Sequence, residues 1–227
     1  MKRLMMVGTL LMLTLALGTN GFAIPIQVGH EIQFEDGPGD YASVATGRGG
    51  AFMASSPSSL WDDFLTFCLE TNEDLAWSPA TFYVAEISTV AKAGGSGGQD
   101  NLSGDPPADS LDSFSAYLYH QAVIGAYADS LLDDVQYAVW YREGEISSLS
   151  GAALTFYNDE YSNYLGSGWV GLLGNVRVLN LVDSSGRPSQ DVLVEVSPVP
   201  EPATMLLLGA GLIGLVGVGR TKWFKKG

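Results

Sequence analysis

Alternating apolar and polar positions predict strands on both sides of the chain's central part. On the N-terminal side the expected strands are 24–28, 31–35, 64–70 and 81–88, with turns at the sequences GPGD and GRGG. On the C-terminal side the pattern predicts a β-hairpin from 175–183 and 191–197, joined by the turn sequence SSGRPS.

Between these strands the apolar positions recur every three or four residues, which is typical of helices. The spacing predicts a helix over 111–132, with Asp109 or Ser110 as its N-cap, and two more helices over 133–141 and 151–165. Strands on both sides of a helical region indicate an α+β fold. We expect a β-sandwich or barrel-like domain with a helical insertion.

A segment rich in Gly, Ser, Asp and Pro, residues 92–109, predicts a flexible loop. Its acidic and amide side chains are oxygen ligands of the kind that calcium prefers, but their spacing matches no calcium loop. A solvated linker is the preferred interpretation. We expect no metal site and no cofactor.

The N-terminal residues have the order of a secretory signal peptide. Two basic residues precede an apolar run over 4–17, and small residues follow at the spacing that signal peptidase reads. We therefore expect cleavage between Ala23 and Ile24, which gives an exported protein. A retained membrane anchor is the alternative, although the apolar run is short for a membrane span.

The C-terminal residues form a second three-part segment. Pro200, Glu201 and Pro202 are followed by an uncharged, mostly apolar run over 203–219 and then by a basic tail. The run is just long enough to predict a transmembrane helix, and the basic tail would stay in the cytoplasm. The domain organisation expected is a signal peptide (1–23), an exported domain (24–197) and a C-terminal sorting segment (198–227).

This C-terminal segment resembles the PEP-CTERM sorting signal of bacteria with an outer membrane. The resemblance implies processing by exosortase, a membrane-embedded protease, near Pro200, Glu201 and Pro202. The precursor would then be anchored in the inner membrane, and the product would reach the cell surface or the extracellular matrix of a biofilm. A plain single-span anchor is the alternative.

The net charge of the central domain limits the classes of partner that it can bind. Residues 24–199 contain 24 acidic and five basic residues, a net charge of −19. Such a surface repels nucleic acid and other polyanions. Cations, amines and neutral polysaccharides are therefore the expected partners.

Two residues stand out chemically. Cys68 is the only cysteine of an exported chain, so it has no partner for an internal disulfide. Gln136 lies among apolar and aromatic residues, where a buried amide must find hydrogen bonds or destabilise the fold.

Together these residues resemble the signature of thioester domains in bacterial surface adhesins. The sequence Phe67-Cys68-Leu69 gives the cysteine half, and Val135-Gln136-Tyr137-Ala138-Val139 gives the glutamine half. The resemblance implies a covalent bond between the Cys68 thiol and the Gln136 side chain, made with loss of ammonia. An amine-bearing partner would then attack this thioester, so the protein would adhere covalently and would not be an enzyme.

Three alternatives remain open from the sequence. Cys68 is also compatible with a small buried core residue, and Gln136 with a helix-surface amide. A Cys–His hydrolase would have to use His30 or His120 as its base, and neither lies in a recognisable signature. A non-covalent structural protein that associates with exopolysaccharide is the remaining function class.

Overall fold

The computed structural model describes residues 24–38, 50–71, 80–92 and 108–197. The chain divides into two units, 1–197 and 198–227, and every described residue belongs to the first. The elements are β1 (Glu31–Asp36), β2 (Ala51–Ser55), β3 (Phe64–Phe67), β4 (Phe82–Ser88), β5 (Val90–Lys92), β6 (Ala108–Ser110), α2 (Ser113–Val123), the 3-10 helix η2 (Asp129–Leu131), α3 (Leu132–Glu143), α4 (Gly151–Gly166), β7 (Val176–Val182) and β8 (Pro188–Glu195).

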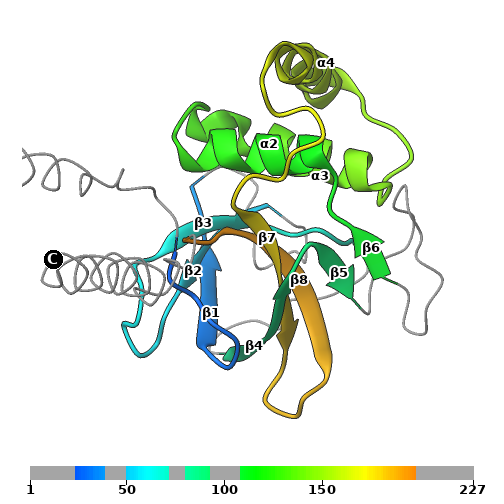
Figure 1. Ribbon diagram of the computed structural model, residues 1–227. Helices are drawn as coiled ribbons and strands as arrows, with labels where there is room; N and C mark the ends of the chain where they lie inside the picture. The colour runs from blue at the N-terminus through cyan, green and yellow to red at the C-terminus, as the bar shows by residue number, and fades with distance from the viewer. Residues whose placement is uncertain (1–23, 39–49, 72–79, 93–107, 198–227) are drawn as a thin grey trace, which may run out of the picture. The chain divides into compact units, whose positions relative to one another are not determined.

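Six strands form one sheet in the order β3-β2-β1-β4-β7-β8, and all its neighbouring strands are antiparallel. The sheet curls so that its two edge strands meet (Figure 1). Just after β3, Cys68 makes an isolated antiparallel bridge with Val192 of β8, and the Leu69 amide donates to the Asp191 carbonyl at 3.0 Å. Curling therefore brings the chain around Cys68 against the last strand.

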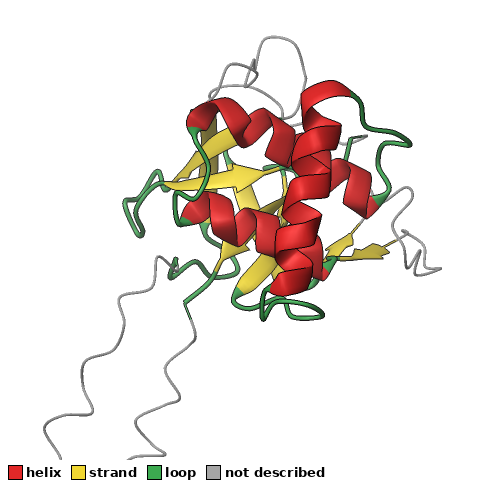
Figure 2. Cartoon of the chain, turned by 90° about the horizontal axis from the view of Figure 1, so that it is seen from above, coloured by secondary structure: helices red, strands yellow, loops and turns green. Residues whose placement is uncertain are grey.

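The helices form two layers over one side of the sheet (Figures 1 and 2). The helices α2 and α3 pack directly on it, with Phe114, Leu118 and Val139 in one apolar cluster with Phe67 and Val178. The helix α4 contacts α2 and α3 on their outer side. The prediction that strands and helices combine in one α+β domain is thus confirmed, and the structure adds that the six-stranded sheet is antiparallel.

The predicted helix over 111–132 is wrong in its length and its cap. Asp112 is the N-cap of α2, and its side chain accepts a hydrogen bond from the Phe114 amide at 2.7 Å. The helix ends at Val123, and Gly125 then takes a left-handed conformation with φ of +74°. The apolar stripe ends at Ala122, where the helix leaves the core.

The predicted strand over 24–28 is also wrong, because there only Ile24 pairs, in a bridge with Val196. The strands β2, β5 and β6 were not predicted. At three to five residues they are too short for a clear alternation. The strands β5 and β6 pair with each other at the two ends of the predicted loop over 92–109. Residues 93–107 lie outside the described part.

Candidate functional site

Cys68 is held in the interior by the strands on either side of it. The side chain is 3% exposed and belongs to an apolar cluster that includes Trp140, Phe64 and Val192. Along β3, alternate side chains point to opposite faces, so Phe67 and Leu69 enter the other cluster, against α2 and α3. The Cys68 side chain therefore points away from that cluster and into the one that also contains Trp140 of α3.

Gln136 is placed by the first part of α3. Two aspartates, Asp133 and Asp134, lie in the helix's first turn, where the backbone dipole favours negative charge. At the other end Gly144, with φ of +85°, caps the helix in the left-handed conformation. Val135 and Val139 anchor the helix in the core, and Gln136 is only 1% exposed.

The structure brings the two predicted residues together. The Cys68 amide donates to Oε1 of Gln136 at 3.0 Å, and Nε2 of Gln136 donates to the Cys68 carbonyl at 2.8 Å. One residue therefore satisfies both ends of the buried carboxamide. This explains how a glutamine occupies an apolar region without the cost of unpaired polar atoms.

Aromatic side chains of α3 lie beside Cys68. Trp140 shares the cluster of Cys68, and Tyr137 packs against it with its ring edge-on to Trp140 at 5.9 Å between centroids. Phe67, the neighbour of Cys68 in the sequence, meets Tyr119 of α2 in the other cluster. Neighbouring residues of a strand face opposite ways, so Phe67 does not share the cluster of Cys68.

A group of buried carboxyls, which the sequence reading missed, lies at the far end of α3. Glu70, Asp109 and Glu143 line a small cavity of about 10 Å³, room for about one water molecule. Burial raises the pKa of Glu143 to about 8, so this carboxyl is largely protonated at neutral pH. The sequence contained one indication of this group, because the predicted buried strand FLTFCLE ends with the charged residue Glu70.

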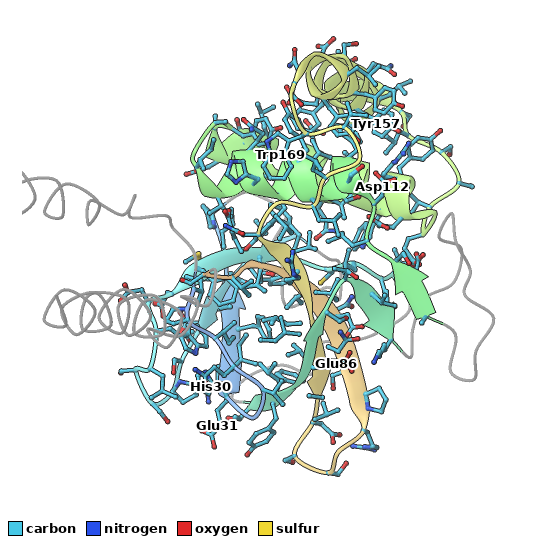
Figure 3. The ribbon with its side chains drawn as sticks, in the orientation of Figure 1. His30, Glu31, Glu86, Asp112, Tyr157 and Trp169 are labelled. Atoms are coloured by element: carbon cyan, nitrogen blue, oxygen red, sulfur yellow. The ribbon has the colours of Figure 1, made fainter. Side chains whose placement is uncertain are left out.

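A larger pocket of about 300 Å³ opens beside this cavity, where α2 begins and α3 ends. Arg142 and Asp112 form an ion pair in its wall, with Nε of Arg142 2.8 Å from Oδ1 of Asp112. Figure 3 shows Asp112 at the start of α2, beneath Tyr157 of α4. The lining residues are Ser110, Leu111, Asp112, Ser113, Arg142, Glu143, Gly171 and Leu173.

We expect Asp112→Ala to destabilise the domain by about 2 kcal/mol, because it removes both the N-cap of α2 and the partner of Arg142. Urea denaturation measures the free energy of unfolding. Asp129→Ala, at an exposed aspartate, is the matched control and should change it by less than about 0.5 kcal/mol. Equal effects of the two substitutions would contradict this role for Asp112.

The two histidines considered as bases for a Cys–His hydrolase each make a polar contact with another residue. Nδ1 of His120 lies 3.0 Å from Oε2 of Glu195, and Nδ1 of His30 accepts from the Gln27 amide at 3.2 Å. Among the residues that the structure describes, no group of three His, Cys, Asp or Glu side chains is placed to hold a metal ion.

The predicted processing sites lie at the limits of the described chain. Ile24 is described, and its amide donates to the Glu195 carbonyl at 2.8 Å, whereas Ala23 is outside the described residues. Pro200, Glu201, Pro202 and the predicted transmembrane helix over 203–219 are also outside them. Within the described ranges, no helix is both long enough and apolar enough to cross a membrane.

The comparisons with known proteins identify the C-terminal segment. Residues 198–220 match the family model of the PEP-CTERM protein-sorting motif. The motif indicates an exported precursor that passes a membrane and is targeted by exosortase. No curated protein and no solved structure matches the chain. None of the comparisons supports the thioester-domain resemblance, so the thioester rests on the geometry at Cys68 and Gln136.

Proposed function

We propose that the exported domain forms an internal thioester between Cys68 and Gln136 and uses it to attach covalently to amine-bearing partners. The observation that carries this proposal is the pair of hydrogen bonds between the Gln136 carboxamide and the backbone of Cys68. They hold the amide carbon beside the residue that bears the only thiol in the chain. The sorted protein would act in adhesion at the cell surface or in the biofilm matrix.

The bond-forming step is an acyl transfer. The thiolate of Cys68 attacks Cδ of Gln136, the Cδ–Nε2 bond breaks, and the nitrogen leaves as ammonia with the thiol proton. A carboxamide is a poor electrophile, and fixed proximity of the two groups offsets this. The Cys68 N–H already donates to Oε1, the oxygen on which negative charge develops during the attack.

In the attachment step the Cys68 sulfur is the leaving group, and the carbonyl of Gln136 is again the group that is attacked. A primary amine attacks the thioester carbonyl, the C–S bond breaks, and the thiolate takes the proton that the amine loses. The product is an amide between the partner and the side chain of Gln136, with the Cys68 thiol restored. Each molecule reacts once, so the protein is a tether without turnover.

Burial around the pair protects the thioester from hydrolysis, so that it remains available for reaction with an amine. Cys68 and Gln136 are 3% and 1% exposed, and Trp140 lies in the cluster of Cys68. Excluding water slows hydrolysis of a reactive intermediate. The negative charge of residues 24–199 attracts the ammonium form of a partner amine toward the domain.

The test is incubation of the folded mature domain with methylamine, followed by peptide mapping. We expect Gln136 to become N-methylglutamine, about 14 Da heavier than glutamine, and the Cys68 thiol to appear at the same time. Cys68→Ala is the control and should show no adduct at Gln136. Absence of the adduct from the native wild-type domain would contradict the proposal.

The second candidate is non-covalent binding to a matrix polysaccharide, favoured by the pocket of about 300 Å³ beside Asp112 and Arg142. In this case the hydrogen bonds of Gln136 would serve stability alone. Retention on a polysaccharide matrix distinguishes the two functions. Undiminished retention of Cys68→Ala would favour non-covalent binding, and its loss would favour the tether.

A further inference from the structure

Trp140 contains a buried donor that has no acceptor in the part of the chain that the structure describes. The residue is 9% exposed, and its Nε1 is enclosed with no hydrogen-bond partner among the residues that the structure describes. Leaving such a group unpaired costs about 1–3 kcal/mol, so a buried orphan donor needs an explanation.

The position of Trp140 relates this donor to Gln136. The two residues are four apart on α3, so their Cβ atoms lie about 5–6 Å from each other on one side of the helix. Helical side chains lean toward the N-terminus of their helix, so a residue at position 140 covers the turn of α3 that carries Gln136. Trp140 also shares its apolar cluster with Cys68.

The carbonyl of Gln136 has capacity for a second donor. Its Oε1 accepts from the Cys68 amide at 3.0 Å, and a carbonyl oxygen has two lone pairs. We propose that the Trp140 indole N–H, which makes no hydrogen bond to Oε1 of the resting Gln136 amide, joins the Cys68 amide as a second donor when Oε1 becomes an oxyanion. This inference rests on the proposed thioester.

The role of this site follows from the charge changes in both acyl-transfer steps. When sulfur or an amine adds to Cδ of Gln136, the carbonyl electron pair moves to Oε1, which becomes an oxyanion. The two donors stabilise that charge until the C–N or C–S bond breaks and the carbonyl returns. The indole keeps its proton throughout, so no further reactant is needed.

Trp61 provides a matched control for Trp140. It lies in the same cluster, is similarly buried, and its Nε1 also lacks a partner in the described part of the chain. Its ring packs on Phe64, with centroids 5.2 Å apart, and it comes from the segment before β3, not from α3. Only Trp140 stands one helical turn from Gln136.

The experiment measures the rate at which methylamine consumes the thioester in wild type, Trp140→Phe and Trp61→Phe. We expect Trp140→Phe to react about 100-fold more slowly or worse, the usual effect of losing one oxyanion donor, and Trp61→Phe to stay within about threefold of wild type. A wild-type rate in Trp140→Phe, or equal slowing in both variants, overturns the inference.

Two further results separate this inference from the thioester itself. If wild type never forms the thioester, the proposed function fails and the inference fails with it, whereas a reactive wild type with an unaffected Trp140→Phe overturns the inference alone. Should Trp140→Phe fold poorly, 3-benzothienylalanine at position 140 replaces only the N–H by sulfur. Slow reaction of this isosteric variant supports the donor role, and a wild-type rate excludes it.

Discussion

Removing the Gln136 side chain is expected to destabilise the domain by about 4 kcal/mol, even where no thioester can form. In a Cys68→Ala background, Gln136→Ala removes the hydrogen bonds that Gln136 makes with the N–H and the C=O of residue 68. Losing a hydrogen bond to a buried group costs about 1–3 kcal/mol, and the lost packing adds to this. The measurement is the free energy of unfolding from urea denaturation, compared with Cys68→Ala alone.

A glutamine outside the site provides the control for this comparison. Gln121, in α2, is partly exposed, so Gln121→Ala in the same background should change the free energy of unfolding by less than about 0.5 kcal/mol. If Gln136→Ala costs no more than Gln121→Ala, then the two hydrogen bonds to residue 68 do not hold α3 to the end of β3.

Stability is expected to fall as the pH rises, because of Glu143. The pKa of this carboxyl rises from 4.5 to about 8 in the folded protein, mainly because of burial and to a smaller extent because of the nearby carboxylates of Asp112 and Asp109. A raised pKa gives stability that is complete below pH 4.5 and is lost as the pH rises through 8. We therefore expect the free energy of unfolding to fall by about 4 kcal/mol between pH 5 and pH 9.

Glu143→Gln removes the charge but keeps the shape of the side chain, so most of this pH dependence should disappear with it. The exposed Glu35→Gln is the control and should leave the wild-type profile unchanged. Thermal or urea unfolding at several pH values gives the profiles. A Glu143→Gln profile as steep as that of wild type would show that other groups cause the loss of stability.

The sequence predicted those parts of the structure that a local pattern determines. The hairpin of β7 and β8 follows from two apolar runs around a Gly-containing turn, and α4 from a helical period ended by a Gly-Ser pair. The contact between Cys68 and Gln136, which are 68 residues apart, was expected from the resemblance to thioester domains and not from a local pattern.

The remaining features depend on tertiary contacts that no local pattern encodes. The end of α2 is set by where the apolar stripe leaves the core and by Gly125, because helix propensity alone would continue. Phe67 and Cys68 are both buried, in different clusters, because the curl of the sheet covers both faces of the chain there. Glu143 lies beyond the predicted end of its helix at residue 141, and its burial depends on β6 and on the chain after β3, which line the same cavity.

The intact mass of the mature domain tests the central claim most directly. A Cys68–Gln136 thioester makes the purified native protein about 17 Da lighter than its sequence mass, by the loss of one ammonia. Cys68→Ala and Gln136→Ala should each have their full sequence masses. A wild-type domain with its full sequence mass and a titratable Cys68 thiol in the unfolded protein would contradict the thioester.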